Sequence, residues 1–310
     1  MKKLMYPKWI RIAAVLTAFL LAAGCAEKVP QPSESTSKPS GQTSKAESSK
    51  AENTESSAAA ETSKTPEPAE PEIIFYHSDL QTTEEVSGKL SEAVVEITYS
   101  RFSYYDTPDG FKRFHLIIEY KNNGAQTFFT PSIGVHLYDG SHQEVKESGS
   151  MIVENVRGVM FPGETDYAYL DGFLTKRDSG GAYVTSDVDL SKGLVPVIEY
   201  VNVQRCNASE YTFIKCETNI TTEVTDAGKI RFTGTITNPV DKDFSMIKVH
   251  YLLFDANDKL LAVVVKGVTN IKAKQTVEVF PMTLSNLEIT PDMVAYCLPS
   301  AEYWWYTSAG

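Results

Sequence analysis

Carboxylates and histidines are the side chains of this chain that could bind a metal ion or catalyse hydrolysis. Asp178, Asp187 and Asp189 flank the segment DSGGAYVTSDVD, where carboxylate and carbonyl oxygens could surround calcium. A solvated loop is the alternative interpretation. Glu144 and Glu147 could act as the acid pair of a glycosidase, although acidic turns also account for them. These patterns allow metal binding or hydrolysis without requiring either.

The five histidines do not have the spacing of a metal site. None has an i, i+2 or i, i+4 partner with carboxylate support, and His136 and His250 fall on the polar faces of predicted strands, where we expect surface residues. The sequence DANDK at Asp255 resembles the start of a calcium loop, but position twelve is Lys266, so we expect a hairpin turn. The chain has neither a Gly-x-Ser-x-Gly elbow nor a phosphate-binding glycine loop. We therefore predict no catalytic residue, no metal and no cofactor.

Aromatic side chains are stronger candidates for a binding surface. In AEYWWYTSAG, Tyr303 and Trp305 fall on one face of a predicted strand, whereas Trp304 and Tyr306 fall on the other. One pair can fill a core, and the other must be covered or exposed. Exposed aromatic rings stack on sugars and anchor protein interfaces. The segment RFSYYDTPDGFKRF has the same ambiguity. The candidate binding residues are therefore Tyr303, Trp304, Trp305, Tyr306, Phe102, Tyr104 and Tyr105.

The N-terminal 24 residues have the features of an export signal. MKKLMYPKWIR carries four positive charges and no acidic residue, and residues 12–23 are apolar except for one threonine. This pattern predicts a secretory signal that is too short to span a bilayer permanently. Ala22, Ala23 and Gly24 lead into Cys25, which resembles the bacterial lipobox. The resemblance implies that Cys25 is lipidated and anchors an extracytoplasmic protein to the membrane. Cleavage by the ordinary signal peptidase is the alternative.

Residues 25–72 form a linker rich in Ser, Glu, Lys and Pro. From Ala26 to Glu72 there is no aromatic residue, and Val29 is the only β-branched aliphatic residue. Such a segment buries too little apolar surface to offset its conformational entropy, so we predict a disordered tether with a reach on the order of 40 Å. The net charge of −11 disfavours nucleic acid and anionic membrane surfaces as partners.

Alternating side chains predict that the body after the linker is all-β. In RFHLIIEYKN, Phe114, Leu116 and Tyr120 fall on one face, and polar residues fall on the other. Turn sequences separate such runs at residues 107–110, 122–124, 139–140, 226–229 and 255–259. Short strands at this spacing favour an antiparallel β-sandwich. Helix is expected only at residues 82–93 and 290–295.

An internal repeat indicates two copies of one domain. When Asn122 is matched with Asn238, Asp139 falls on Asp255 without a gap. The copies close with RCNASEYTF from residue 205 and YCLPSAEYWW from residue 296, which places Cys206 and Cys297 at matching positions. We expect domains at residues 73–209 and 210–310.

Three cysteines in these domains leave the disulfide pairing open. Cys206 and Cys216 could pair across a hairpin at the domain junction. Alternatively, Cys206, Cys216 and Cys297 could all be buried free thiols, because an anaerobic source would lack the usual oxidising pressure.

The repeat also resembles the FxLYD family of small extracellular immunoglobulin-like β-sandwiches found in bacterial lipoproteins, often in tandem. The motif is VHLYD at residues 135–139 and YLLFD at residues 251–255, and neither copy has Phe at the first position. The resemblance implies a non-catalytic binding or spacer module.

Three functions therefore remain at this point. The favoured one is a lipid-anchored module that binds a protein or a cell-envelope component. A structural spacer or assembly subunit is the second, and a cell-wall or carbohydrate hydrolase is the third.

Overall fold

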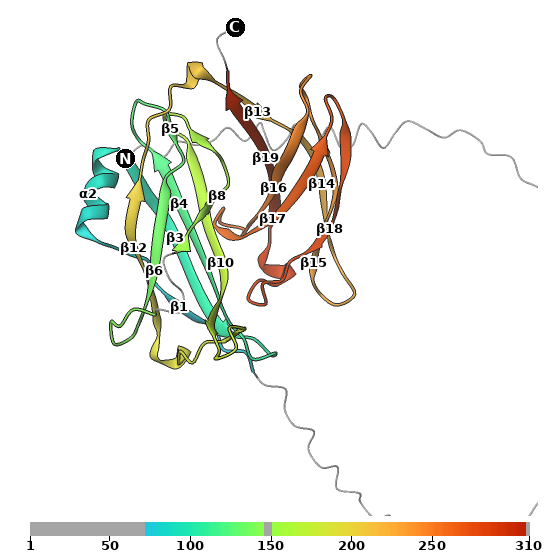
Figure 1. Cartoon of the computed structure of the whole chain (residues 1–310). Coiled ribbons are helices and arrows are strands. Elements are labelled where there is room, and N and C mark those ends of the chain that lie inside the picture. Colours follow the sequence, from blue (N-terminus) through green and yellow to red (C-terminus); the bar gives the residue numbers. More distant parts are fainter. Residues whose placement is uncertain (1–71, 146–150, 308–310) are drawn as a thin grey trace, which may run out of the picture. The chain divides into compact units, whose positions relative to one another are not determined.

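The computed structural model describes residues 72–145 and 151–307 (Figure 1). The described chain is all-β, as predicted, with several antiparallel sheets. The predicted signal, Cys25 and the predicted tether up to residue 71 lie outside the described residues.

The N-terminal half, strands β1 to β12, contains two larger sheets and a two-stranded one. The first sheet has the order β1-β3-β4-β10-β11, with β8 also paired to β10. Its strands are β1 (Tyr76–Ser78), β3 (Val95–Asp106), β4 (Lys112–Asn122), β8 (Glu154–Asn155), β10 (Thr165–Arg177) and β11 (Tyr183–Thr185). The second sheet, β2-β12-β6-β7, contains β2 (Gln81–Thr82), β6 (Ser132–Asp139), β7 (Met151–Ile152) and β12 (Leu194–Asn202). The third pairs β5 (Phe128–Phe129) with β9 (Val159–Met160). Only the β2–β12 pairing among these described strands is parallel.

The C-terminal half, strands β13 to β19, contains seven strands in two sheets with the orders β13-β19-β16-β17 and β14-β15-β18. Its strands are β13 (Tyr211–Lys215), β14 (Glu217–Val224), β15 (Ile230–Thr237), β16 (Phe244–Phe254), β17 (Leu260–Ile271), β18 (Thr276–Thr283) and β19 (Tyr296–Tyr306). Three short 3₁₀ turns are η1 (Leu190–Lys192), η2 (Ala208–Glu210) and η3 (Pro291–Met293). The sequence predicted a short helical segment where η3 forms.

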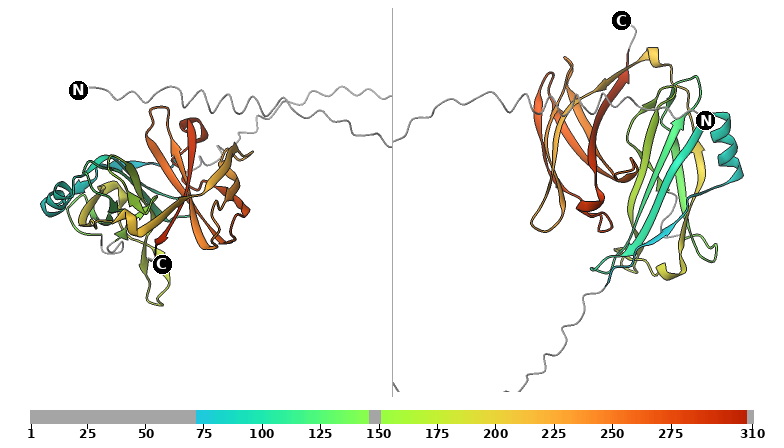
Figure 2. Two further views of the ribbon diagram at one scale, coloured as in Figure 1. Left: turned by 90° about the horizontal axis from the view of Figure 1, so that it is seen from above. Right: turned by 180° about the vertical axis from the view of Figure 1, so that it is seen from behind.

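The helix α2 (Glu84–Glu92) lies in the region where the sequence predicted one. Thr83 caps it, because its hydroxyl accepts a hydrogen bond from the backbone N–H of Val86 at 3.3 Å. The buried Val86 and Leu90 attach the helix to the N-terminal core. Both views of Figure 2 place α2 beside the N-terminal strands and away from the orange and red strands of the C-terminal half.

Each half has its own apolar core, and a third apolar cluster joins the two halves. Leu116 and Ile118 of β4 point into the N-terminal core, as their alternation predicted. The intervening Ile117 belongs instead to the third cluster, where it packs with Leu252 and Phe254 of β16. The C-terminal half therefore covers part of the face of β4 that was predicted to be polar and exposed.

The matched asparagines of the sequence repeat make the same hydrogen bonds. Asn122 is fully buried, donates through Nδ2 to the carbonyls of Gln126 (2.7 Å) and Met160 (3.3 Å), and accepts at Oδ1 from the N–H of Gly124 (2.9 Å). Asn238 repeats this pattern: its Nδ2 donates to the carbonyls of Lys242 (2.7 Å) and Lys272 (3.0 Å), and its Oδ1 accepts from the N–H of Val240 (3.1 Å). The amide is needed because it supplies two donors and one acceptor within a single side chain. Two carbonyls and one N–H must be satisfied at each site, which explains why both copies have Asn here.

The aspartates that end the two motifs also have one structural role. Oδ1 of Asp139 accepts from the backbone N–H groups of Ser141 (2.8 Å) and Gln143 (2.9 Å). Oδ1 of Asp255 accepts from Asn257 (2.8 Å) and Lys259 (2.9 Å) in the same way. The DANDK segment is accordingly the turn between β16 and β17, as predicted, and Asp255 stabilises that turn through its carboxylate.

The predicted match between Cys206 and Cys297 is wrong. Leu137 and Leu253 are equivalent in the repeat, and across the sheet they face Pro196 and Cys297, respectively. Cys297 therefore corresponds to Pro196 on β12, whereas Cys206 follows that strand. The resemblance between the two closing sequences arose from similar composition at different positions of the fold.

His250 is buried, which corrects the expectation of a surface position on β16. The side chain is 3% exposed, both ring nitrogens lack a hydrogen-bond partner within the described residues, and the ring packs edge-on against Tyr169 (6.1 Å). Burial lowers the pKa of His250 to about 4, with a smaller lowering from Lys248 and an opposing effect from Glu154. The C-terminal half thus carries a neutral histidine against the N-terminal half.

We expect a His250→Phe variant to resist acid better than the wild type. The unfolded histidine takes up a proton below its ordinary pKa of 6.5, whereas the folded one stays neutral to about pH 4, so stability falls as the pH falls through that window. Urea unfolding should show the variant gaining about 2 kcal/mol over the wild type between pH 7.5 and pH 4.5. His142→Asn, in an exposed turn, is the control. Equal acid sensitivity of His250→Phe and wild type would contradict the prediction.

Candidate functional site

The C-terminal aromatic residues divide between the core and the surface. Tyr303 and Trp305 are partly buried and pack against the C-terminal core, where the Tyr303 ring stacks on Phe244 at 4.3 Å. Trp304 and Tyr306 lie on the opposite face of β19 and are 42% and 59% exposed. The alternation of β19 thus packs one predicted pair against the core and leaves the other pair available to a ligand.

The aromatic residues predicted near residues 102–105 do not form a surface. Phe102, Tyr104 and Tyr105 are all buried. Tyr104 accepts a hydrogen bond at its hydroxyl from the N–H of Leu194 (2.9 Å), and the Tyr105 hydroxyl lies 3.2 Å from Nε2 of His115. These rings belong to the packing of β3 and are not accessible to a ligand.

A groove of about 380 Å³ lies along the exposed face of β19, and we call it the Trp304 groove. Alternate residues of β19, namely Leu298, Ser300, Glu302 and Trp304, line it. One wall is formed by β13, an edge strand of its sheet, and the other by residues 156–159, 161 and 164–167 of the N-terminal half. Trp304 lies near Phe129 (5.4 Å between ring centroids) and Tyr211 (5.6 Å). Side chains of both halves therefore build the groove.

Arg157 connects two carboxylates in the Trp304 groove. Its Nε lies 3.1 and 3.2 Å from the two carboxylate oxygens of Glu302, and its Nη1 lies 2.8 Å from Oε2 of Glu164. Burial opposes the charged guanidinium, but the two glutamates outweigh it and raise the pKa of Arg157. The side chains are partly buried, so this ion-pair network fixes the position of Arg157 more firmly than a surface pair would.

Asp166 lies deeper in the same wall and holds its proton unusually strongly. It is 1% exposed, and Oδ2 accepts from the Tyr120 hydroxyl (3.0 Å) and the Arg157 N–H (3.3 Å). Its Oδ1 has no hydrogen-bond partner among the described residues. Burial raises the pKa of Asp166 to about 7, although these hydrogen bonds and the charge of Arg157 lower it in part. Burial therefore favours the protonated form of this carboxyl group far more than it would be favoured in an exposed aspartate.

Sequence patterns missed Arg157, Asp166 and Glu302. Arg157 lies in the irregular segment between β8 and β9, where no periodicity distinguishes one charged residue from another. Asp166 is the second residue of β10, and the alternation of that strand does not show that this carboxylate is buried. Glu302 had a usable signal, because it stands two residues before Trp304 and so shares its strand face.

Gly158 limits the position of Trp304, so a side chain there should displace the indole. A Cβ added at Gly158 would lie 2.2 Å from Nε1 and 2.6 Å from Cδ1 of Trp304. We expect Gly158→Ala to lose about 1–2 kcal/mol of folding free energy through overpacking and to change the Trp304 emission. Gly88→Ala, which meets nothing within 4 Å, is the matched control. An unshifted emission spectrum in Gly158→Ala would contradict the geometry.

A second cavity, of about 400 Å³, lies farther along the contact between the halves. Lys248 Nζ lies 2.6 Å from Oε2 of Glu154, and the Tyr169 hydroxyl donates to the same oxygen at 2.9 Å. Its polar side chains are thus engaged with one another, and Tyr169 packs against His250. The Trp304 groove is the better candidate site because it alone of the two contains an exposed ring of the predicted aromatic set.

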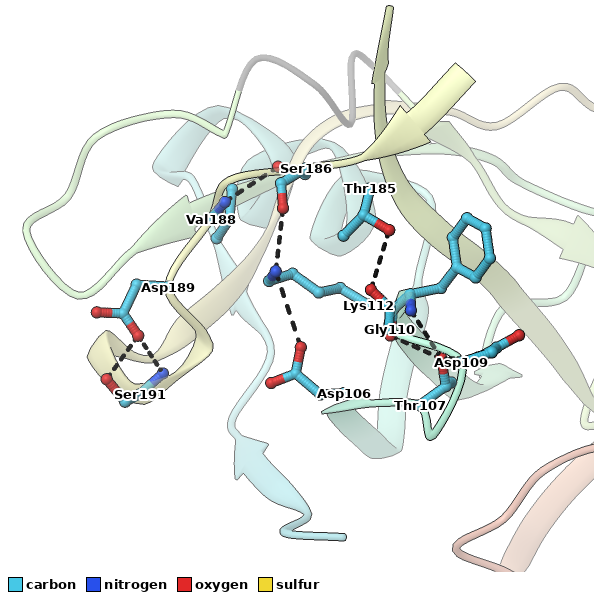
Figure 3. Close-up of polar contacts among 11 residues, drawn as sticks. Asp106, Thr107, Asp109, Gly110, Lys112, Thr185, Ser186, Val188, Asp189 and Ser191 are labelled. Carbon is cyan, nitrogen blue, oxygen red and sulfur yellow. Dashed lines mark hydrogen bonds and ion pairs between the residues drawn. The ribbon is translucent and has the colours of Figure 1, made fainter. Parts of the chain in front are cut away.

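The aspartates considered for calcium have other partners. Asp178 accepts from the N–H groups of Gly180 and Ala182 (both 2.9 Å), and Asp187 pairs with Lys176. Figure 3 shows the third aspartate, Asp189, bonded to Ser191. Within residues 72–145 and 151–307, no group of three His, Cys, Asp or Glu side chains could hold a metal ion. A loop stabilised by local hydrogen bonds accounts for these residues.

The neighbouring Lys112 also serves the loops. Its Nζ donates to the Ser186 carbonyl at 3.0 Å and lies 3.8 Å from Oδ1 of Asp106 (Figure 3). The Thr185 hydroxyl donates to the Gly110 carbonyl at 3.0 Å in the same view. These contacts tie the end of β11 to the turn between β3 and β4.

The remaining chemical candidates either have other partners or lie outside the described residues. Glu144 pairs with His136, whose Nδ1 lies 2.9 Å away, and Glu147 lies outside the described residues. Cys206, Cys216 and Cys297 are free thiols, so Cys206 and Cys216 are not joined in this structure. Burial raises the pKa of Cys216 to about 11, which keeps this thiol protonated at neutral pH.

Among the described residues, no helix has the length and apolar character that a membrane crossing requires. No protein-family model matches the chain, and no curated protein has a matching sequence.

Proposed function

We propose that this protein is a non-catalytic binding module of the cell envelope and that its ligand occupies the Trp304 groove. One observation carries the proposal: the exposed Trp304 ring and the fixed Arg157–Glu302 pair share a single groove. Ligand sites combine apolar or aromatic walls with a few polar groups held in place, and this groove has both. The partner class is a protein or an envelope component, and nucleic acid is disfavoured by the negative charge of the chain.

The proposal includes two tandem immunoglobulin-like β-sandwiches, at residues 73–209 and 210–310. Two separate apolar cores support it, as do the seven strands of the C-terminal half in sheets of four and three. The shared hydrogen bonds of Asn122 and Asn238 support a common origin for the two copies. Function on such a fold depends on the site, so the groove rather than the sandwich carries the binding proposal.

The proposal also places the protein outside the cytoplasm, attached to the membrane by a lipid on Cys25. It rests on the charged and apolar N-terminal segments and on the small residues before Cys25. Cells given an alkyne analogue of palmitate should label the wild type and not Cys25→Ala, and the variant should leave the membrane fraction. A membrane-bound, unlabelled wild type would contradict lipidation.

Retention on isolated cell envelopes tests the binding role. The wild-type chain should remain on washed envelope fragments, whereas Trp304→Ala should be retained at least about tenfold less, because an aromatic anchor in a groove carries much of the binding energy. Phe280→Ala, which removes an exposed ring (76%) on β18, is the matched control. Equal retention of Trp304→Ala and wild type would contradict a binding role for the groove.

A spacer function is the second candidate, and the contact between the halves favours it. Arg101 Nη2 lies 2.6 Å from Oε1 of Glu288, and Arg113 Nη2 donates to the Ser285 hydroxyl at 3.1 Å. With the third apolar cluster, these bonds hold the two halves in a fixed arrangement, as a spacer needs. A spacer predicts that Trp304→Ala lowers stability without changing envelope retention.

A further inference from the structure

We propose that the ligand of the Trp304 groove is a neutral oligosaccharide, with one sugar ring against Trp304 and its hydroxyls toward Arg157 and Glu302. This inference rests on the proposed function, because it assigns a ligand class to the same groove. Three features of the groove support it: its charge balance, its remaining hydrogen-bonding capacity and its shape.

The charges of the groove are balanced. At the surface of the groove, Arg157 and Lys215 contribute two positive charges, and Glu164 and Glu302 contribute two negative ones. Asp166 also belongs to the lining, but it is 1% exposed and so does not face a ligand. An anionic ligand would meet the two glutamates, and a cationic ligand would meet the guanidinium. Either would leave one set of groove charges facing a like charge, which disfavours binding. The balance therefore favours a ligand without net charge.

The polar side chains of the groove have both donors and acceptors to spare. Nε and Nη1 of Arg157 are engaged with glutamates, whereas Nη2 has no acceptor among the described residues. A guanidinium has five N–H donors, and each carboxylate of Glu164 and Glu302 has more lone pairs than these bonds use. A hydroxyl group both donates and accepts, so a polyhydroxylated ligand can satisfy Arg157 and a neighbouring glutamate together.

The shape of the groove suits a linear chain of sugar rings. From Leu298 to Trp304 its floor follows one face of β19 over roughly 20 Å. Trp304 offers a flat, partly exposed ring at one end, and the C–H face of a sugar ring is apolar enough to cover it. Hydroxyls at the rim of that sugar ring would then lie toward the charged side chains. A sugar has both surfaces in one rigid unit, which lowers the entropic cost of binding.

An extended peptide is the competing ligand, because β13 is an edge strand that could accept another strand. The structure favours the saccharide over strand addition. β13 offers only Tyr211–Lys215, and the Phe213 ring packs edge-on against Phe161 of the opposite wall at 5.6 Å. This ring pair crosses the groove beside the strand edge and restricts the approach of a peptide backbone.

Tryptophan emission can report contact with the predicted ring directly. Trp9, Trp304 and Trp305 are the three tryptophans of the chain, so a full chain carrying Trp9→Phe in detergent retains two. With Trp305→Phe added, the remaining Trp304 should change its emission in a saturable way when cellotetraose, chitotetraose or maltotetraose is added. With Trp304→Phe added instead, the remaining Trp305 packs against the core beside Phe244, on the opposite face of β19, and should not respond. A response of Trp305 alone would overturn the assignment to the groove.

Retention on treated envelope fragments tests the ligand class. The fragments are digested with protease and extracted with organic solvent before the protein is added. Retention of the wild type that survives both treatments, with at least about tenfold less for Trp304→Ala, supports a saccharide even if none of the three probes binds. Loss of retention after protease digestion would overturn the saccharide and leave the groove as a protein-binding site. Loss after solvent extraction would overturn it in favour of a lipid. Absence of retention on untreated envelopes would overturn this inference and the proposed function together.

A second variant tests the groove independently, in case Trp304→Ala does not fold. Glu302→Gln keeps the side-chain volume and removes one charge of the Arg157 network, so it should weaken retention without removing a ring. Glu278→Gln on the exposed face of β18 is its matched control. Retention of Glu302→Gln equal to that of Glu278→Gln would overturn the role given to the Arg157–Glu302 pair.

Discussion

An Asn238→Ala variant is expected to lose about 4 kcal/mol of its free energy of unfolding. The fully buried amide binds the carbonyls of Lys242 and Lys272 and the N–H of Val240. Alanine leaves these three backbone groups without the amide, and each buried group that loses its partner costs about 1–3 kcal/mol. Urea unfolding should therefore show a lower midpoint with an unchanged slope.

Two comparisons make this result specific. Asn122→Ala should cost a similar amount, because Asn122 makes the equivalent three bonds in the first copy. Asn257→Ala should change stability by less than about 0.5 kcal/mol, since its side chain is exposed in the turn after β16. A loss below about 1 kcal/mol in both buried variants would contradict the repeated role of this amide.

An Asp166→Asn variant should gain stability relative to the wild type when the pH rises from acid to alkaline. Burial raises the folded pKa of Asp166 to about 7 from its ordinary 3.8. The stability that this group contributes is fully present below pH 3.8 and is lost as the pH rises through 7, because only the unfolded chain ionises freely in that window. Between pH 4.5 and pH 8 the wild type should lose about 3 kcal/mol that the asparagine variant keeps.

Comparing the two proteins at both pH values isolates Asp166 from the buried histidines. Burial lowers the pKa of His115 and His250 to about 4, and their contribution to stability changes in the opposite direction over part of the same range. Both histidines are present in wild type and variant, so their effect cancels in the difference. Asp226→Asn, in an exposed turn, is the control and should change little with pH. A pH-independent difference between Asp166→Asn and wild type would contradict the raised pKa.

Local sequence patterns predicted a good part of the fold. Alternation in β4 located the strand and its core face, and the turn sequences at residues 107–110 and 255–259 fall where adjacent strands reverse. These signals are local, because a strand with one buried face must alternate and a tight turn needs particular residues. The repeat was detectable because Asn122 and Asn238 satisfy the same backbone groups, which restricts the residue at both positions.

The candidate site was only partly predictable. Alternation showed that Trp304 and Trp305 must face opposite ways, but it could not tell which ring the core would take. That choice depends on which face of β19 meets Phe244 and which meets Phe129, two residues far away in the chain. Phe102, Tyr104 and Tyr105 are aromatic residues of the type found in binding surfaces. Packing between the sheets nevertheless buries all three.

The sequence by itself determined the all-β class, the positions of several strands and turns, and the repeated asparagine and aspartate. All of these follow from residues close together in the chain or from a comparison of two segments. Only the tertiary structure decided that His250 is buried, that Cys297 corresponds to Pro196, and that Arg157 meets Glu302 in one groove. Arg157 and Glu302 are separated by 145 residues, and no local periodicity or propensity relates them. They meet because apolar burial joins β4 and β10 to β16 and β17, and that contact is a property of whole surfaces.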